Sequence, residues 1–551
     1  MGKDEMFDGA GFSQEELDSL LDGFDPGSSQ ASDDMLEQIM QEYHTGASDA
    51  REYPDQGTFR SYDGNTEYHS FDEALPDASP EEFYQYSDTD RELDEEDEYD
   101  DEYYDDYDDD EEDDRPRRRR KKKRSVLSVI GNFLLAVITI VSVLYLFCVY
   151  SSWKPIRQLR TTYILTAMST INHKWLATAL IPPEIIDDVM REQYSTAAAA
   201  VGIESGWGTV DINPLPTLSQ ALTEEDLQAQ QAANTEDKEA QQEDPVVEPE
   251  ADRVLSADQS YFFDLFWELD RDSVFDYMDE HPDVVENGWY WIDVNRSAVG
   301  DTGTSMKTIY GDQVLAVNAI DGVILIRVYL SSNNSRGVLA ICKDTSRVSL
   351  CPASTLGQVG QTAGVICDDN DGILAMTGSA FLDDGFGNGG QISGLAVCSG
   401  RTYGSRLGGS SKRLELRDDN MMYILDSVSS LGDGTRDACE FHPALIIDGN
   451  VLAEDPDWDG INPRAALGQS SRLETMMIVI EGRYADSLGC STKYVADKLK
   501  QYGCVQALNL DGGTSAMLYY KGYYVNRCSN PELPGGRTLP TAWVYKPFYT
   551  R

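Results

Sequence analysis

Residues 507–521 read ALNLDGGTSAMLYYK and combine two apolar runs of strand length with a short polar break between them. Apolar runs of this length, bounded by turn residues, predict two β-strands. The break, residues 511–515, holds one carboxylate, two adjacent glycines and two hydroxyls. It is therefore either a tight turn between strands or a place where the chain approaches a ligand.

The polar break carries the chemistry of a candidate site. Gly512 and Gly513 let the backbone approach a ligand closely and can present amide groups to an anion. Thr514 and Ser515 add hydrogen-bond donors beside them. Asp511 supplies the carboxylate, and we expect this residue to carry any catalysis.

Further strands and a helix are predicted upstream of the break. Apolar runs of strand length occur at residues 314–319, 322–330, 338–341, 372–376, 444–447 and 476–480. A helix is expected from Ser491, placed as its N-cap, to Tyr502, with Gly503 as its C-terminal stop. The carboxy-terminal part, from about residue 254 to 551, is therefore predicted to be an α+β, mixed-sheet globular domain.

Four segments occur in an order that resembles a known family. They are MTGSAFLDDG at 376–385, NPRAALG at 462–468, MMIVIEGR at 476–483 and NLDGGTS at 509–515. They are similar, in this order, to the NGGFF element, the PRTAVG element, the strand ending in acidic-Gly-Arg and the NLDGGGS motif of the phosphodiester glycosidases. The resemblance covers roughly residues 310–547, and the ordered series is more specific than any single element.

The resemblance implies a hydrolase that cleaves a sugar from a sugar-1-phosphodiester in a cell-surface glycan, an exopolysaccharide or a lipid-linked precursor. Asp511 is the first choice for the catalytic carboxylate, with Glu481, Asp383 and Asp384 as candidates for a second. Arginine has the planar fork that suits phosphate oxygens, although each arginine has an ion pair as its alternative role. The expected substrate-binding residues are Asn509, Gly512, Gly513, Thr514, Ser515, Arg464 and Arg483.

Two departures from the family pattern favour a different class of function. Thr377, Gly378 and Ser379 stand where the family has Asn-Gly-Gly, and Thr514 replaces the third glycine of the main motif. The alternative is a catalytically inactive glycan-binding or scaffold protein of the cell surface.

Residues 125–150 form an uncharged run that predicts one transmembrane helix. As a helix, 26 residues span roughly 39 Å at 1.5 Å per residue, and the hydrocarbon core of a bilayer needs about 30 Å. A buried core helix is the alternative. The basic block at 115–124, RPRRRRKKKR, lies directly before this run, whereas Lys154 and Arg157 follow it. The positive-inside bias then predicts a cytoplasmic amino terminus and an extracellular carboxy-terminal domain.

The amino-terminal 114 residues contain 42 Asp and Glu against 4 Lys and Arg. So high a like charge with few apolar residues predicts a disordered acidic cytoplasmic tail. Two short amphipathic patches, residues 12–24 and 34–43, are candidates for binding a cytoplasmic protein partner. We expect no nucleic-acid partner, because the one basic block abuts the apolar run and is explained by the bilayer.

Two segments connect the apolar run to the domain. Residues 151–221 predict a membrane-proximal helical segment, interrupted at Pro182 and Pro183 because proline stops a helix. Residues 222–253 are rich in Glu, Gln, Ala and Asp and predict an acidic linker.

Cysteine and acidic residues leave two questions open. Eight of the nine cysteines follow residue 340, an even number that suits either disulfides in an oxidising compartment or buried thiols. Asp455, Asp457, Asp459 and Gly460 match the opening of a calcium loop, but the twelfth position is Ala466 in place of Glu. We therefore expect no resident cofactor or metal, with calcium as the alternative to a solvated acidic turn.

Overall fold

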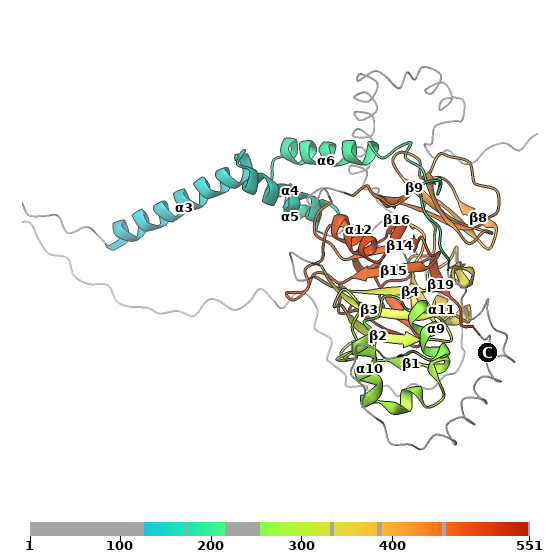
Figure 1. The fold of residues 1–551 in the computed structure, drawn as a ribbon. Coiled ribbons are helices and arrows are strands. Elements are labelled where there is room, and N and C mark those ends of the chain that lie inside the picture. Colours follow the sequence, from blue (N-terminus) through green and yellow to red (C-terminus); the bar gives the residue numbers. More distant parts are fainter. Residues whose placement is uncertain are drawn as a thin grey trace, which may run out of the picture. The chain divides into compact units, whose positions relative to one another are not determined.

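The computed structural model describes residues 126–170, 173–214, 254–330, 335–382, 388–453 and 459–548. The chain divides into two compact units, residues 1–138 and 139–551, and the second contains every described element from α4 onward (Figure 1). The acidic tail with its two amphipathic patches, the basic block and the acidic linker at 222–253 lie outside the described residues.

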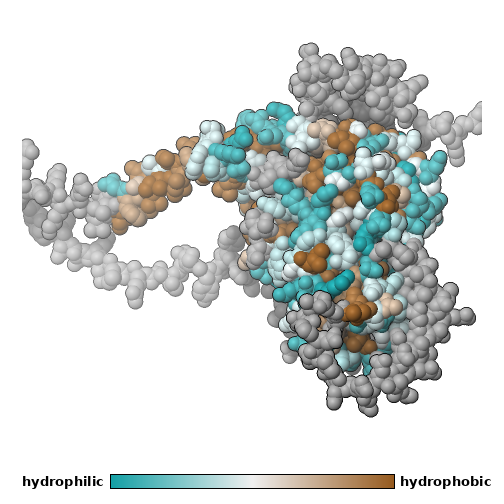
Figure 2. Space-filling view, viewed as in Figure 1, coloured by the Kyte–Doolittle hydropathy of each residue, from teal (hydrophilic) through white to brown (hydrophobic). Residues whose placement is uncertain are grey.

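The apolar run forms helix α3, Val126–Tyr150. In the described part of the chain, the stretch Ile130–Tyr150 is the one helix long and apolar enough to cross a membrane. Large apolar side chains cover its surface (Figure 2). The expected apolar helix is therefore confirmed.

Three helices follow α3 and pack around a small apolar core. They are α4 (Lys154–Met168), α5 (Lys174–Thr178) and α6 (Pro183–Ala198). Ile164, Leu165, Ile186 and Val189 are buried between them. The predicted break at the proline pair is confirmed, because α6 begins at Pro183, where a missing amide costs no helical hydrogen bond.

A nine-stranded sheet forms the centre of the domain. Its strands, in spatial order, are β1 (Asp293–Asn295), β2 (Gln313–Asn318), β3 (Val323–Leu330), β4 (Ser335–Cys342), β15 (Thr475–Ile480), β14 (Arg464–Ser470), β16 (Cys504–Leu510), β12 (Ala444–Ile447) and β13 (Asn450–Val451). The apolar runs predicted as strands at 314–319, 322–330, 338–341, 444–447 and 476–480 all lie in it.

Two five-stranded sheets complete the β-structure. One has the order β10 (Met422–Asp426), β9 (Lys412–Arg417), β11 (Thr435–Phe441), β7 (Leu395–Cys398), β8 (Arg401–Gly404). The other has the order β18 (Tyr523–Tyr524), β17 (Leu518–Tyr520), β6 (Leu374–Thr377), β19 (Thr541–Tyr545), β5 (Val348–Pro352). The ladders that join strands within all three sheets are antiparallel. The α+β class is confirmed, and the expected mixture of strand directions is corrected to antiparallel pairing.

The central sheet is buried on both faces. In β15, Met476 and Ile478 pack into one apolar core, and Met477 and Val479 pack into another, as the alternation of side chains along a strand requires. The first core lies under the helices α9 (Ala257–Leu265), α10 (Arg271–Glu280) and α12 (Thr492–Gln501). The second is shared with the two smaller sheets, against one of which the helix α11 (Ala363–Asp369) packs.

Two local predictions are settled here. Ser491 stands at the N-cap of α12 as predicted, but its side chain makes no capping hydrogen bond. Gly503 takes the left-handed conformation expected after the helix, with φ of 83°.

All nine cysteines are free, and the eight in the domain are buried, so the buried-thiol interpretation replaces that of disulfides.

Candidate functional site

Strand register brings the quoted segments to one edge of the central sheet. Arg464 pairs with Ile480 between β14 and β15, and Ala465 pairs with Leu510 between β14 and β16. Residues 464, 481 and 511 therefore stand at the same edge, although the sequence separates them by up to 47 positions. The candidate site is this edge.

The DGGTS loop packs tightly on the 462–464 segment. A Cβ atom on Gly512 would lie 2.4 Å from the Pro463 carbonyl oxygen, and a Cβ on Gly482 would lie 2.9 Å from the Pro463 nitrogen. The Gly513 amide donates a hydrogen bond of 3.2 Å to the same carbonyl, and Gly513 has φ of 58°. Both glycines of the motif are thus required by packing and backbone conformation, whatever they also contribute to a ligand.

Arg483 lies beside this loop. A Cβ atom on Gly513 would be 3.6 Å from Arg483 Nη2. Arg483 is exposed and has φ of 66°, a backbone conformation that is unfavourable for a residue with a Cβ atom. Protein around its guanidinium group lowers the pKa of Arg483 through desolvation. Among the described residues its side chain has no carboxylate within salt-bridge distance, which leaves its charge available to an anionic ligand.

Arg464, by contrast, is held by protein groups. Its Nε donates to the Cys490 carbonyl at 2.9 Å, and its Nη2 donates to the Asp459 and Gly460 carbonyls at 2.8 and 3.0 Å. The same nitrogen lies 3.1 Å from the Asp459 carboxylate. This geometry is that of an anchor for the loop at 459–460, and substrate contact by Arg464 stays a prediction.

Glu481 is also engaged, by two arginines. Arg336 Nη2 and Arg527 Nε each donate to Glu481 Oε2 at 2.9 Å, and the Arg527 amide donates to Oε1 at 2.9 Å. Glu481 is 5% exposed. Its carboxylate therefore links β4 to the loop at 527, and its role as a second catalytic carboxylate remains a prediction. Asp383 and Asp384 lie outside the described residues.

Two polar atoms at this edge are buried without a partner in the described structure. Asn509 Nδ2 donates to the His442 carbonyl at 2.8 Å, so its amide oxygen must face the other way. That oxygen and Ser515 Oγ both lack a hydrogen-bond partner there. Buried polar atoms are rarely left unpaired, so both are suited to a ligand or an ordered water. Thr514 is half-buried beside them, and its carbonyl accepts from the Arg537 amide at 3.3 Å.

Sequence reasoning missed His442, which joins β11 to β12 at the same edge. Ala444 pairs with Leu508, so His442 lies next to the end of β16. The pKa of His442 is lowered because surrounding protein desolvates the ring and Arg464 repels the charged form. Histidine is scarce in this chain, with 5 in 551 residues, and this scarcity was the available signal.

The departures at 377–379 occupy a tightly packed position. Leu518 of β17 pairs with Met376 of β6, so these residues lie near the end of the DGGTS loop. The Ser379 amide donates to Thr541 Oγ1 at 2.8 Å, and a Cβ on Gly378 would lie 2.3 Å from the same oxygen. Thr377 is fully buried, and its hydroxyl has no hydrogen-bond partner in the described structure.

The calcium motif is described only at its end. Asp455 and Asp457 lie outside the described residues. Asp459 is buried and accepts from the Thr492 amide at 3.2 Å, in addition to its ion pair with Arg464. Burial raises the pKa of Asp459, although Arg464 opposes this. Within the described ranges, no cluster of three or more His, Cys, Asp or Glu suits a metal ion, and calcium binding stays an open alternative.

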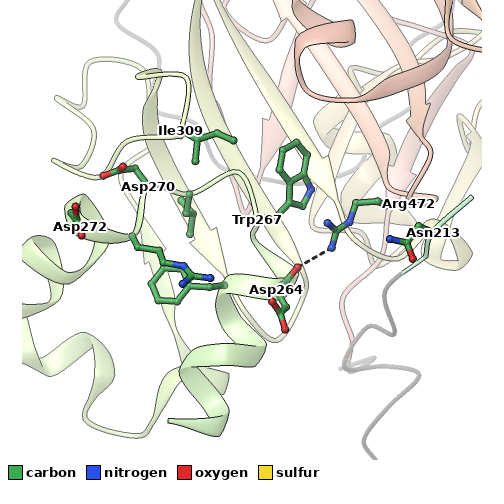
Figure 3. A pocket seen from close by; sticks show the side chains of 10 residues that line it. Asn213, Asp264, Trp267, Asp270, Asp272, Ile309 and Arg472 are labelled. Atoms are coloured by element: carbon green, nitrogen blue, oxygen red, sulfur yellow. Dashed lines mark hydrogen bonds between the residues drawn. The ribbon is translucent and has the colours of Figure 1, made fainter. Parts of the chain in front are cut away.

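A separate pocket of about 690 Å³ lies at the opposite edge of the central sheet (Figure 3). Arg472 follows the end of β14 there and donates to the Asp264 carbonyl at 3.0 Å. Trp267 Nε1 donates to Glu474 at 3.3 Å. Asp264, Asp270 and Asp272 add carboxylates to its lining. The pocket combines an aromatic side chain with both signs of charge, and none of the predicted site residues lines it.

Comparison with known proteins finds a family match over part of this chain. Residues 370–546 match the family model of the phosphodiester glycosidases. The match contains all four segments named above and confirms the resemblance for this part of the chain.

Individual relatives are more distant. A 158-residue alignment is 26% identical to the SPbeta prophage-derived uncharacterized protein YomE of Bacillus subtilis (strain 168), over 26% of this chain and 24% of that protein. The chain thus spans about a quarter of that relative's length. The zebrafish N-acetylglucosamine-1-phosphodiester alpha-N-acetylglucosaminidase catalytic domain, auto-inhibited by its pro-peptide, is 18% identical, with 41% of this chain and 82% of that one covered and a TM-score of 0.34. A hypothetical protein from Synechocystis is 14% identical, with 42% and 63% covered and a TM-score of 0.30.

Proposed function

We propose, from the phosphodiester glycosidase domain matched at residues 370–546, that this protein hydrolyses a sugar-1-phosphodiester at the edge formed by residues 464, 481 and 511. The observation that carries the proposal is the convergence of three sequence segments there by strand register. A chance likeness of short motifs would not require them to meet at one place.

The reaction needs little from the protein beyond charge and position. A water oxygen forms a bond to the anomeric carbon, and the bond from that carbon to the phosphate oxygen breaks. The electron pair leaves with the phosphate monoester, and the proton of the water passes to a base or to solvent. Phosphate is a good leaving group, so the main requirement is to stabilise positive charge at the anomeric carbon. In the proposal, the Asp511 carboxylate has this role.

Arg483 is the proposed phosphate contact. Its charge has no ion-pair partner among the described residues, and its guanidinium lies next to the glycine loop. A planar guanidinium can donate two parallel hydrogen bonds to phosphate oxygens. In this arrangement the phosphate oxygens of the substrate would accept hydrogen bonds from Arg483. The sugar hydroxyls would form hydrogen bonds with the unpaired Asn509 Oδ1 and Ser515 Oγ.

Substitution of Asp511 by Asn tests the proposal. The change keeps side-chain volume and removes the charge, so we expect turnover of a sugar-1-phosphodiester to fall by at least about 10²-fold with an unchanged melting curve. Asp418→Asn, an exposed position on the β9–β10 turn, is the matched control and should retain turnover. Near-normal turnover in folded Asp511→Asn would remove Asp511 from the mechanism.

A second candidate is glycan binding without catalysis, and the pocket at the opposite edge favours it. Trp267 and the carboxylates there offer an apolar face and hydrogen-bond acceptors, the two features that a sugar ring requires. Calorimetry with oligosaccharides would show binding that Trp267→Ala weakens at least tenfold. Absence of turnover on every sugar-1-phosphodiester, combined with such binding, would make this the preferred function.

We further propose that α3 spans the membrane with the amino terminus in the cytoplasm and the domain outside, with the acidic tail free to recruit a cytoplasmic partner. The basic block before α3 and the apolar surface of the helix support this orientation. Protease added to intact cells should remove the domain and spare an epitope placed at the amino terminus. Loss of that epitope with retention of the domain would reverse the orientation.

A further inference from the structure

The helices after α3 are tied to its carboxy-terminal end. Tyr145, one and a half turns before that end, donates through its hydroxyl to the Leu180 carbonyl at 2.8 Å. Arg160 of α4 donates to the carbonyls of Val149 at 2.6 Å and Ser151 at 3.2 Å. The turn between α5 and α6 therefore lies beside the apolar helix itself.

This helical region has the surface of an element that lies in a membrane interface. Trp153, Leu159, Trp175 and Leu180 are 61%, 65%, 61% and 50% exposed. Tryptophan is enriched where membrane meets water, because its ring is apolar and its N–H is polar. Residues 125–183 contain no Asp or Glu, and Lys154 and Arg157 are exposed. The region is therefore apolar and cationic, which suits anionic lipid head groups.

The same helices contact the candidate site. Thr166 Oγ1 accepts from the Ile461 amide at 2.9 Å, and Asn462 Nδ2 donates to Ser169 Oγ at 2.9 Å. A Cβ atom on Gly460 would lie 2.6 Å from the Thr166 nitrogen. Helix α4 has 15 residues, a length of about 22 Å at 1.5 Å per residue. The 461–464 segment is therefore held no farther from the end of the apolar helix than about the length of α4.

We propose that residues 153–170 and 173–181, here named the interfacial platform, lie in the head-group region of the bilayer and hold the site at the membrane surface. The substrate is then a lipid-linked sugar-1-phosphodiester, in which the phosphate is esterified to a membrane-anchored alcohol. This substrate class rests on the proposed function. A phosphodiester in a lipid head group lies on the surface where the platform rests, and sharing one surface raises its effective concentration at the site.

Photo-crosslinking tests the platform without reference to turnover. The full chain is placed in anionic phospholipid vesicles that contain a lipid with a diazirine near its head group. Labelling is expected on the peptide at 174–181 in addition to α3. The peptide that contains Val428, a residue that follows the end of β10 and is 59% exposed, should stay unlabelled. Labelling confined to α3, or equal labelling of both peptides, overturns the platform.

Matched substrates test the substrate class. One sugar-1-phosphate is esterified to a long-chain polyprenol in the vesicles, and the same sugar-1-phosphate is esterified to a short soluble alcohol. The double variant Trp175→Ser with Leu180→Ser should cut turnover of the lipid substrate at least tenfold and leave the soluble substrate unchanged, whereas Val428→Ser changes neither.

The outcomes separate the two proposals. Equal loss on both substrates, or faster turnover of the soluble one by the unmutated chain, overturns the lipid assignment while the hydrolase stands. Cleavage of neither substrate refutes the hydrolase and the substrate class with it, and the crosslinking result still decides the platform.

Discussion

Arg483 keeps a left-handed backbone conformation with no described ion pair to compensate. For a residue with a Cβ atom, this conformation costs roughly 1–2 kcal/mol relative to glycine. Strain of this kind persists where the surrounding structure imposes it, and it is frequent at functional sites. At this residue a single substitution should change substrate binding and the free energy of unfolding in opposite directions.

We predict that Arg483→Gly raises the KM for a sugar-1-phosphodiester at least tenfold while the free energy of unfolding rises by up to about 1 kcal/mol. The glycine relieves the backbone and removes the phosphate contact. Steady-state kinetics and urea denaturation on the same preparation check both parts. Arg401→Gly, in the mostly exposed strand β8, is the control for loss of a surface arginine and should leave KM unchanged. An unchanged KM in Arg483→Gly would exclude the phosphate contact.

For single residues, the sequence was enough to select the DGGTS loop as a candidate site. It did not show which groups pack against the residues of the loop. The pair of glycines indicated that another group approaches the backbone at Gly512. In the structure this group includes the Pro463 carbonyl, because β14 lies beside β16. Such a contact between distant segments cannot be inferred from the local sequence. The engagement of Arg464 by Asp459 is likewise set by the fold of the 459–464 loop.

Between elements, one buried charge cluster joins the start of the domain to the central sheet. Lys343 Nζ, at the end of β4, lies 2.6 Å from Glu268 Oε1 and 2.8 Å from Glu474 Oε1. Glu268 is fully buried, and its second oxygen has no partner among the described residues. Burial raises the pKa of Glu268 from 4.5 to about 7.

This cluster makes part of the stability depend on pH. Between about pH 4.5 and 7 the folded protein holds a proton on Glu268 that the unfolded chain has released. The contribution of this group is therefore full below the unfolded pKa and is lost as the pH rises through the folded pKa. We predict that Glu268→Gln flattens this part of the profile by on the order of 2 kcal/mol. Denaturation at several pH values measures it, with exposed Glu184→Gln as the control. A profile that Glu268→Gln leaves unaltered contradicts the assignment.

Strand prediction succeeded or failed according to what the strand buries. The run at 476–480 in β15 is apolar throughout because both faces of the strand are covered. Strand β9, KRLELR, was not among the predicted strands, because the predictions rested on apolar runs and most of its residues are charged. In the structure Arg413 and Glu415 are fully buried and bonded to each other at 2.8 Å. No local pattern distinguishes a buried ion pair from two exposed charges.

On the scale of the whole molecule, the segment at 199–213 belongs to the domain by its contacts. Trp207 is 5% exposed and donates through Nε1 to the Met422 carbonyl at 2.8 Å. Asp448 accepts from the Gly206 and Trp207 amides at 2.9 and 3.1 Å. Lys412 Nζ donates to the Ala200 carbonyl at 2.7 Å. Cutting the chain after this segment would leave buried polar groups of the second sheet without partners.

We predict that a truncated chain that begins at Ala251 is less stable than one that begins at Ala199 by at least about 3 kcal/mol, the usual cost of deleting a buried tryptophan. Urea denaturation of the two chains measures the difference. Trp207→Ala in the longer chain should reproduce most of the loss. Superimposable denaturation curves for the two chains would mean that the segment adds nothing to the fold.

The burial of the thiols has a practical consequence for mapping the molecule. Eight of the nine cysteines are buried, and burial raises the pKa of those eight, so little reactive thiolate is present at neutral pH. The ninth, Cys148, lies in α3, out of reach of a charged reagent if that helix is in a bilayer. With α3 in a bilayer, the native chain should therefore react little with a charged maleimide reagent. Under these conditions a cysteine introduced at an exposed position of the domain becomes the principal site of labelling by that reagent, without removal of any natural thiol.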